Sequence, residues 1–91
     1  MPETLVALEY TYVPDVLARR APHRDAHLAL LRRLHEEGAL VIAGATGDPV
    51  SGALIVFRDR AAAEGFAADD PYGAAGLVAG HRILPWTVVV P

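Results

Sequence analysis

The sequence contains no cysteine, and this absence excludes disulfides, thiolate metal sites and a cysteine nucleophile. It also lacks any run of about 18 apolar residues, so no segment is expected to span a membrane. The first residues have neither the basic flank nor the long apolar core of a signal peptide, which predicts a cytoplasmic protein. No glycine-rich stretch leads into the Lys-Ser/Thr pair of a phosphate-binding loop.

Net charge is also small. At −3 it gives no general attraction to nucleic acid or to anionic membranes. The 91 residues suffice for one domain, 1–91, with a modest core. Yet 53% of them are hydrophobic and the mean hydropathy is +0.28, which is high for a small monomer. We therefore expect part of the apolar surface to be covered in a homodimer, or in a higher oligomer built from it.

The most regular pattern in the chain predicts one amphipathic helix over residues 20–38. Leu30, Leu31 and Leu34 recur at the three- and four-residue spacing that places them on one helix face. Charged residues fall on the opposite face, and Gly38 is a plausible stop signal.

Four strands and a second helix are predicted around this helix. Apolar runs between turn residues indicate strands at 5–12, 39–44, 52–57 and 82–90, and a helix at 60–68. The run 39–44 is nearly continuous and is expected to be buried. A turn is expected at Gly80, and Pro85 favours a sheet edge or a bulge.

The resulting order, β-α-β-β-α-β, predicts an α+β protein of the ferredoxin-like class. Its four-stranded antiparallel sheet would carry both helices on one face. No further element remains to cover the other face. A second copy stacked sheet on sheet would do so, which again predicts a homodimer formed through the sheet faces.

His27 is the first candidate for chemistry. It lies four residues before Leu31 and seven before Leu34, so its ring leaves the helix from the apolar stripe. One interpretation is a half-buried histidine with a structural hydrogen bond. The other is a general acid or base, because imidazole titrates near neutral pH.

Asp70 and Tyr72 are the next candidates. Asp followed by Pro is a favourable start for a helix, so capping alone would explain Asp70 without any role in chemistry. Alternatively the carboxylate reaches His27, fixes its tautomer and supports the imidazolium. The fold permits this contact, because both helices lie on one face of the sheet. Tyr72 is a packing or dimer residue, or it lines a ligand pocket.

Arg20 and Arg24 lie close to His27 in sequence. They are either solvated charges or the groups that hold a carboxylate or enolate near the helix N-terminus. His23 and His27 have a metal-chelating spacing, but the sequence offers no clear third ligand. Neither a metal nor a cofactor is therefore expected.

Several of these residues together resemble the YciI-like (YCII-related) family. The shared motifs are Arg20-x-Pro22-x-Arg24-x-x-His27-Leu28, Gly38-x-Leu40-x-x-Ala43-Gly44, Asp70-Pro71-Tyr72-x-x-Ala75-Gly76-Leu77 and Pro85-Trp86. The resemblance extends over nearly the whole chain. It implies a dimeric α+β barrel of ferredoxin-like protomers, with an active site whose histidine and aspartate fall on His27 and Asp70. Some relatives are dehydrochlorinases, in which this pair is proposed to move protons.

Two functional hypotheses follow. The first is a cofactor-free acid–base enzyme, a lyase or isomerase of dehydrochlorinase-like type, acting on a small anionic or enolisable compound. His27 would move the proton, and Asp70 would orient the His27 ring. Arg20 and Arg24 would hold the anion beside Tyr72. The alternative is a non-catalytic dimeric module that binds a small ligand or another protein.

Overall fold

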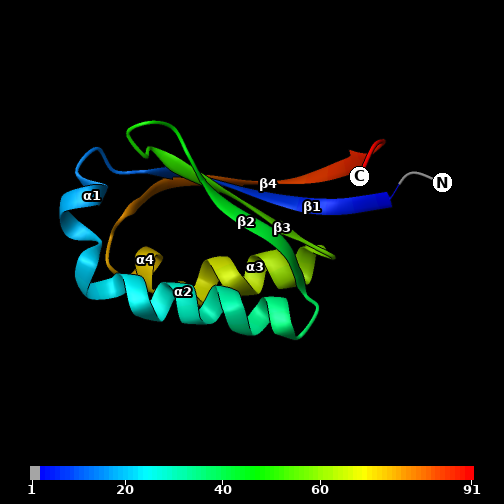
Figure 1. Ribbon diagram of the computed structural model, residues 1–91, viewed down its shortest axis with the longest axis horizontal. Helices are drawn as coiled ribbons and strands as arrows, with labels where there is room; N and C mark the ends of the chain where they lie inside the picture. Colours follow the sequence, from blue (N-terminus) through cyan, green and yellow to red (C-terminus); the bar gives the residue numbers. More distant parts are fainter. Residues whose placement is uncertain (1–2) are drawn as a thin grey trace.

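A four-stranded antiparallel sheet carries the helices on one of its faces (Figure 1). The computed structural model describes residues 3–91. The elements are, in chain order, β1 (Glu3–Tyr12), α1 (Val16–Arg19), α2 (Ala21–Glu36), β2 (Leu40–Thr46), β3 (Gly52–Phe57), α3 (Arg60–Asp69), α4 (Pro71–Ala74) and β4 (Val78–Val88). The strand order β2-β3-β1-β4, with antiparallel pairing throughout, confirms the predicted ferredoxin-like fold.

The core lies between the sheet and the two longer helices, α2 and α3. Side chains alternate along β1, and Leu8, Tyr10 and Tyr12 point toward the helices and are buried. Phe57 from β3 and Phe66 from α3 meet with ring centroids 5.7 Å apart. None of the helices within residues 3–91 is long and apolar enough to cross a membrane.

Helix α2 confirms the predicted amphipathic helix. A proline occupies its first turn, and Gly38, with φ of 83°, follows its last turn in the left-handed conformation that ends many helices. Leu30, Leu31 and Leu34 are partly buried against the core. His27 is the one residue of α2 that is fully buried.

Two expectations about the edge strands were wrong. Strand β4 begins at Val78 instead of residue 82, and Gly80 lies inside it, paired with Thr11, rather than in a turn. A register shift just beyond this pair absorbs one extra residue, which local sequence signals do not reveal. Strand β2 is an edge strand and is exposed after its first two residues, because it has a neighbour on one side only. Pro85 does lie on an edge strand, β4, as predicted.

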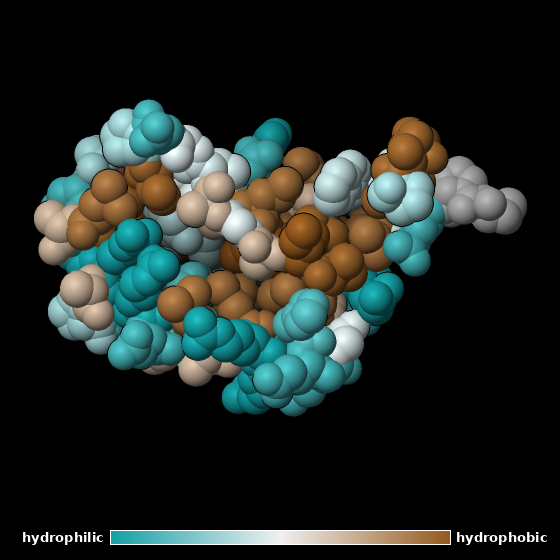
Figure 2. Space-filling view, in the orientation of Figure 1, coloured by the Kyte–Doolittle hydropathy of each residue, from teal (hydrophilic) through white to brown (hydrophobic). Residues whose placement is uncertain are grey.

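The surface along the edge of β2 is apolar. Figure 2 shows hydrophobic side chains across the middle of this view, with hydrophilic side chains along the outer side of α2 below them. Ile42 of β2 is 63% exposed, although it is a large aliphatic residue. The apolar run that suggested a buried strand therefore lies largely at the surface.

We expect Gly52→Ala to lower the free energy of unfolding by about 1–3 kcal/mol, because a Cβ at this position would overlap the carbonyl oxygen of Tyr10. Gly80→Ala is the matched control, since a Cβ there meets nothing within 4 Å. Its effect should stay within about 0.5 kcal/mol. Urea unfolding of the two variants measures the difference, and equal stabilities would contradict the close approach of β3 to β1.

Candidate functional site

A buried histidine and a buried aspartate meet behind the first half of α2. His27 Nδ1 lies 2.7 Å from Asp70 Oδ1, across 43 positions of sequence. His27 is 5% exposed and Asp70 is 1% exposed. The structure thus brings together the two residues that were predicted from the sequence to form a pair.

Local chain geometry fixes Asp70 where it can reach the imidazole. It ends α3 and caps α4, in an extended conformation that turns the chain between the two helices. Its Oδ1 accepts a second hydrogen bond, of 3.1 Å, from the backbone N–H of Tyr72. Pro71 then starts α4 with its backbone already set for a helix. The carboxylate is therefore held by its own helix cap before it contacts His27.

Aromatic rings hold the imidazole on its other sides. The Tyr72 ring stacks on His27 with a centroid distance of 3.7 Å and an interplanar angle of 1°. Phe66 approaches the imidazole edge-on, with centroids 6.2 Å apart. Because a carboxylate only accepts hydrogen bonds, Nδ1 carries the proton in this pair, and neutral His27 has its lone pair on Nε2. Within residues 3–91 the imidazole makes this one hydrogen bond, so Nε2 remains for a ligand.

A cavity of about 150 Å³ opens between α2 and the hairpin formed by β2 and β3. His27, Tyr72, Arg20 and Arg24 all line it. Asp70 stands behind His27 and does not line it. The five predicted site residues are therefore gathered at one place, with the carboxylate shielded from the cavity by the ring that it orients.

Two arginines place positive charge at the N-terminus of α2. Arg20 is half-buried and Arg24 is exposed, and neither forms an ion pair with another residue in the described part of the chain. Both line the cavity. An arginine without a carboxylate partner is suited to binding an anion from solution.

Two tyrosines of β1 lie near the pair, and one of them, Tyr12, is a cavity residue that the sequence did not reveal as part of the site. Burial raises the pKa of Tyr10, and the nearby negative charge of Asp70 adds to the effect. Burial and Asp70 likewise raise the pKa of Tyr12, while the charges of Arg20 and Arg24 act in the opposite direction. Strand alternation placed both rings on the same face as Leu8, but only the folded chain shows that Tyr12 lines the cavity.

Two buried polar atoms near the pair have no hydrogen-bond partner within residues 3–91. They are Asp70 Oδ2 and the Tyr72 hydroxyl oxygen. Buried polar groups usually find a partner, and because Tyr72 lines the cavity, its unpartnered hydroxyl indicates a place where water or a ligand atom binds. In the same described range, no group of three His, Cys, Asp or Glu side chains is placed to hold a metal ion.

The fold and the site define a ferredoxin-like α+β protein with a buried His–Asp pair beside a small cavity. The chain belongs to the YCII-related domain family, whose domain matches residues 4–87. It is 36% identical over 86 residues to Protein YciI from Escherichia coli O6:H1, with 82% of this chain and 88% of that protein covered. It is 32% identical over 88 residues to an uncharacterised protein from Haemophilus influenzae, with 85% of this chain and 90% of that protein covered.

Solved structures share the fold. One is 5-chloro-2-hydroxyhydroquinone dehydrochlorinase (TftG) from Burkholderia phenoliruptrix AC1100, in complex with 2,5-dihydroxybenzoquinone. It matches with a TM-score of 0.73 at 24% identity, covering 90% of this chain and 92% of that chain. Another is NE2512, a protein of unknown function from Nitrosomonas europaea, with a TM-score of 0.58 at 17% identity, covering 100% of this chain and 93% of that chain.

We expect Asp70→Ala to lower the free energy of unfolding by about 2–4 kcal/mol, because it removes a helix cap and leaves a buried imidazole N–H without a partner. Asp59→Ala is the matched control. Asp59 caps α3 by accepting a hydrogen bond of 2.8 Å from the Ala62 N–H, and it is exposed. Its loss should cost about 1 kcal/mol. Urea unfolding at neutral pH compares the two, and equal losses would mean that the contact with His27 contributes nothing to stability.

Proposed function

We propose that this protein is a cofactor-free acid–base enzyme of the lyase or isomerase type. The observation that carries the proposal is the buried contact between His27 Nδ1 and Asp70 Oδ1, made beside a cavity that His27 also lines. This contact holds the imidazole in one tautomer and one orientation, with Nε2 left for proton transfer. Asp70 supports the positive charge that His27 acquires when it takes a proton.

The proposed reaction begins when His27 Nε2 removes a proton from a carbon next to a carbonyl or enol group. In an isomerisation the imidazolium returns that proton to another carbon of the same molecule. In an elimination the enolate formed by proton removal then expels a leaving group such as chloride from the neighbouring carbon, so the enolate electron pair becomes a double bond and chloride departs with the electron pair of the C–Cl bond. In both cases negative charge develops on an oxygen, and Arg20 and Arg24 supply positive charge to stabilise it.

The dimensions of the cavity support a substrate with one small ring or a chain of comparable size. An apolar protein cavity of about 150 Å³ accommodates benzene, and the cavity here is about 150 Å³. The dehydrochlorinase that shares the fold was crystallised with 2,5-dihydroxybenzoquinone, which has one ring and acidic hydroxyl groups. A hydroxylated, anionic ring compound therefore fits both the volume and the charge of this site, and dehydrochlorination is the form of elimination that we favour.

The test is to follow chloride release from 5-chloro-2-hydroxyhydroquinone, and C–H exchange in D₂O for a panel of small enolisable acids. We expect His27→Ala to slow the reaction by about 10²–10⁴-fold, the usual contribution of a positioned acid or base. His35→Ala, on the exposed end of the same helix, should keep the wild-type rate. Full activity in the His27 variant would contradict the proposal. Binding of these compounds without any turnover or exchange would instead identify a non-catalytic binding module.

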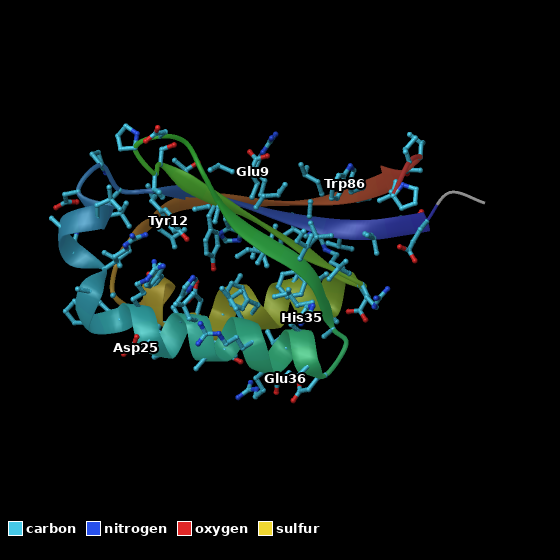
Figure 3. The ribbon with its side chains drawn as sticks, viewed as in Figure 1. Glu9, Tyr12, Asp25, His35, Glu36 and Trp86 are labelled. Atoms are coloured by element: carbon cyan, nitrogen blue, oxygen red, sulfur yellow. The ribbon has the colours of Figure 1, made fainter. Side chains whose placement is uncertain are left out.

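We also propose that the protein forms a homodimer through the sheet face that the helices leave uncovered. Strand register places Leu84 and Trp86 of β4 and Ile42 of β2 on this face, and Trp86 and Ile42 are exposed. Figure 3 shows Trp86 on the side of the sheet away from the helices, together with Glu9. Glu9 is neutralised there by an ion pair of 3.0 Å to Arg82. A face that is apolar and locally charge-balanced suits a second copy of itself.

We expect Trp86→Lys to convert the dimer to a monomer at micromolar concentration, because it places a charge in the apolar part of the proposed interface. Leu17→Lys is the matched control. Leu17 is 46% exposed and Trp86 is 43% exposed, but Leu17 lies in α1, away from that face. Sedimentation velocity of both variants and the wild type gives the answer. A wild-type protein that sediments as a monomer would contradict the dimer.

A further inference from the structure

Tyr12 occupies a special position in the sheet. The pairing of β1 with β4 changes register between Thr11, which faces Gly80, and Tyr12, which faces Val78. One extra residue on β4 lies between those partners. Such bulges bend a strand and redirect the side chain beside them, and they are common next to functional sites. The Tyr12 N–H donates a hydrogen bond of 2.9 Å to the Ser51 carbonyl, so the redirected residue is firmly held.

One aromatic ring, that of Tyr72, lies between the Tyr12 ring and the imidazole of His27. It packs edge-on against Tyr72, with centroids 5.9 Å apart and planes at 75°. Tyr72 in turn stacks face to face on His27. Tyr12 is 8% exposed and lines the same cavity as these two residues. Figure 3 shows it on the helix side of the sheet, at the end of the molecule where α2 begins.

The charges around Tyr12 define what its hydroxyl can do. Burial raises its pKa, so the hydroxyl keeps its proton at neutral pH and remains a hydrogen-bond donor. The positive charges of Arg20 and Arg24 also act on it, and both arginines line the cavity. A neutral donor and two cations therefore converge on one part of the cavity wall. This combination stabilises a negatively charged oxygen.

We infer that Tyr12 donates a hydrogen bond to an anionic oxygen of the bound ligand, at the part of the cavity where Arg20 and Arg24 supply positive charge. The inference rests on the proposed function and specifies its ligand: a compound with one ring or its equivalent, carrying an ionised enol, phenol or carboxyl oxygen. The proton that His27 removes would then come from a carbon conjugated to that oxygen.

Tyr10 provides a matched control within the same strand. It is two residues earlier on the same face of β1, it is 4% exposed, and burial and Asp70 also raise its pKa. It does not line the cavity. Replacing either tyrosine with phenylalanine keeps the ring and its packing and removes only the hydroxyl.

The experiment measures the Kd of two probes by isothermal titration calorimetry, at neutral pH, for the wild type and for the Tyr12→Phe and Tyr10→Phe variants. One probe is 2,5-dihydroxybenzoquinone, which is ionised under these conditions, and the other is phenol, an uncharged ring of similar size. We expect Tyr12→Phe to weaken binding of the anion by about tenfold to a hundredfold, the usual effect of losing a hydrogen bond to a charged group. Phenol should bind this variant as it binds the wild type, and Tyr10→Phe should change neither Kd.

An unchanged Kd for the anion in Tyr12→Phe overturns the inference, as does an equal loss for both probes, which would indicate a packing role. A wild-type protein that binds neither probe at millimolar concentration also overturns it. These failures are distinct from failure of the proposed function, which is judged by chloride release or C–H exchange and by the His27→Ala variant. Loss of catalysis in His27→Ala together with normal anion binding in Tyr12→Phe would keep the enzyme and remove only the role of Tyr12.

Discussion

The contact between His27 and Asp70 is the interaction on which the arrangement of the helical layer depends. It joins the first half of α2 to the junction of α3 and α4 through a distance of 2.7 Å. Neither side chain has access to much water, so each would be costly to bury without the other. The pair therefore fixes where α2 lies over the sheet. The cavity between α2 and the β2–β3 hairpin has its position set by the same contact.

The region around this contact also contains buried polar atoms whose hydrogen-bonding capacity the folded chain leaves unused. Asp70 Oδ2 and the Tyr72 hydroxyl are buried without a partner within residues 3–91. A core selected only for stability would replace these groups with apolar ones or satisfy them internally. The backbone at the start of α4 follows the ordinary preferences of helix termini, since Asp70 is a good cap and Pro71 a good first helical residue. The departure from ordinary packing lies in these two buried atoms on the residues that contact the His27 ring, and such departures are expected at functional sites.

Local signals in the sequence were sufficient for α2, for the cap at Asp70 and for the side of the helix from which His27 projects, because these depend on residues within one or two turns. The ferredoxin-like order followed from the succession of elements. The contact of His27 with Asp70 was only permitted by that order, since 43 positions separate the two residues. The start of β4 was missed because its register depends on an extra residue that only pairing with β1 reveals. Tyr12 was not assigned to the site for a related reason, because its neighbours come from α2 and α4.

Strand β2 connects the site to the opposite surface of the sheet. Its alternation directs Ala43 and Ala45 toward the helices, where they line the cavity together with Ala53 of β3, the cross-strand partner of Ala45. Three methyl groups in place of larger side chains leave the space unfilled, and this is why a cavity rather than packed core lies in front of His27. Ile42, which directly precedes Ala43, points to the uncovered face and is largely exposed. An edge strand with small residues on one face and an exposed aliphatic residue on the other makes most of its contacts within the chain with the neighbouring strand, β3. A second copy packed against that outer face would hold β2 in place and, with it, the wall of the cavity.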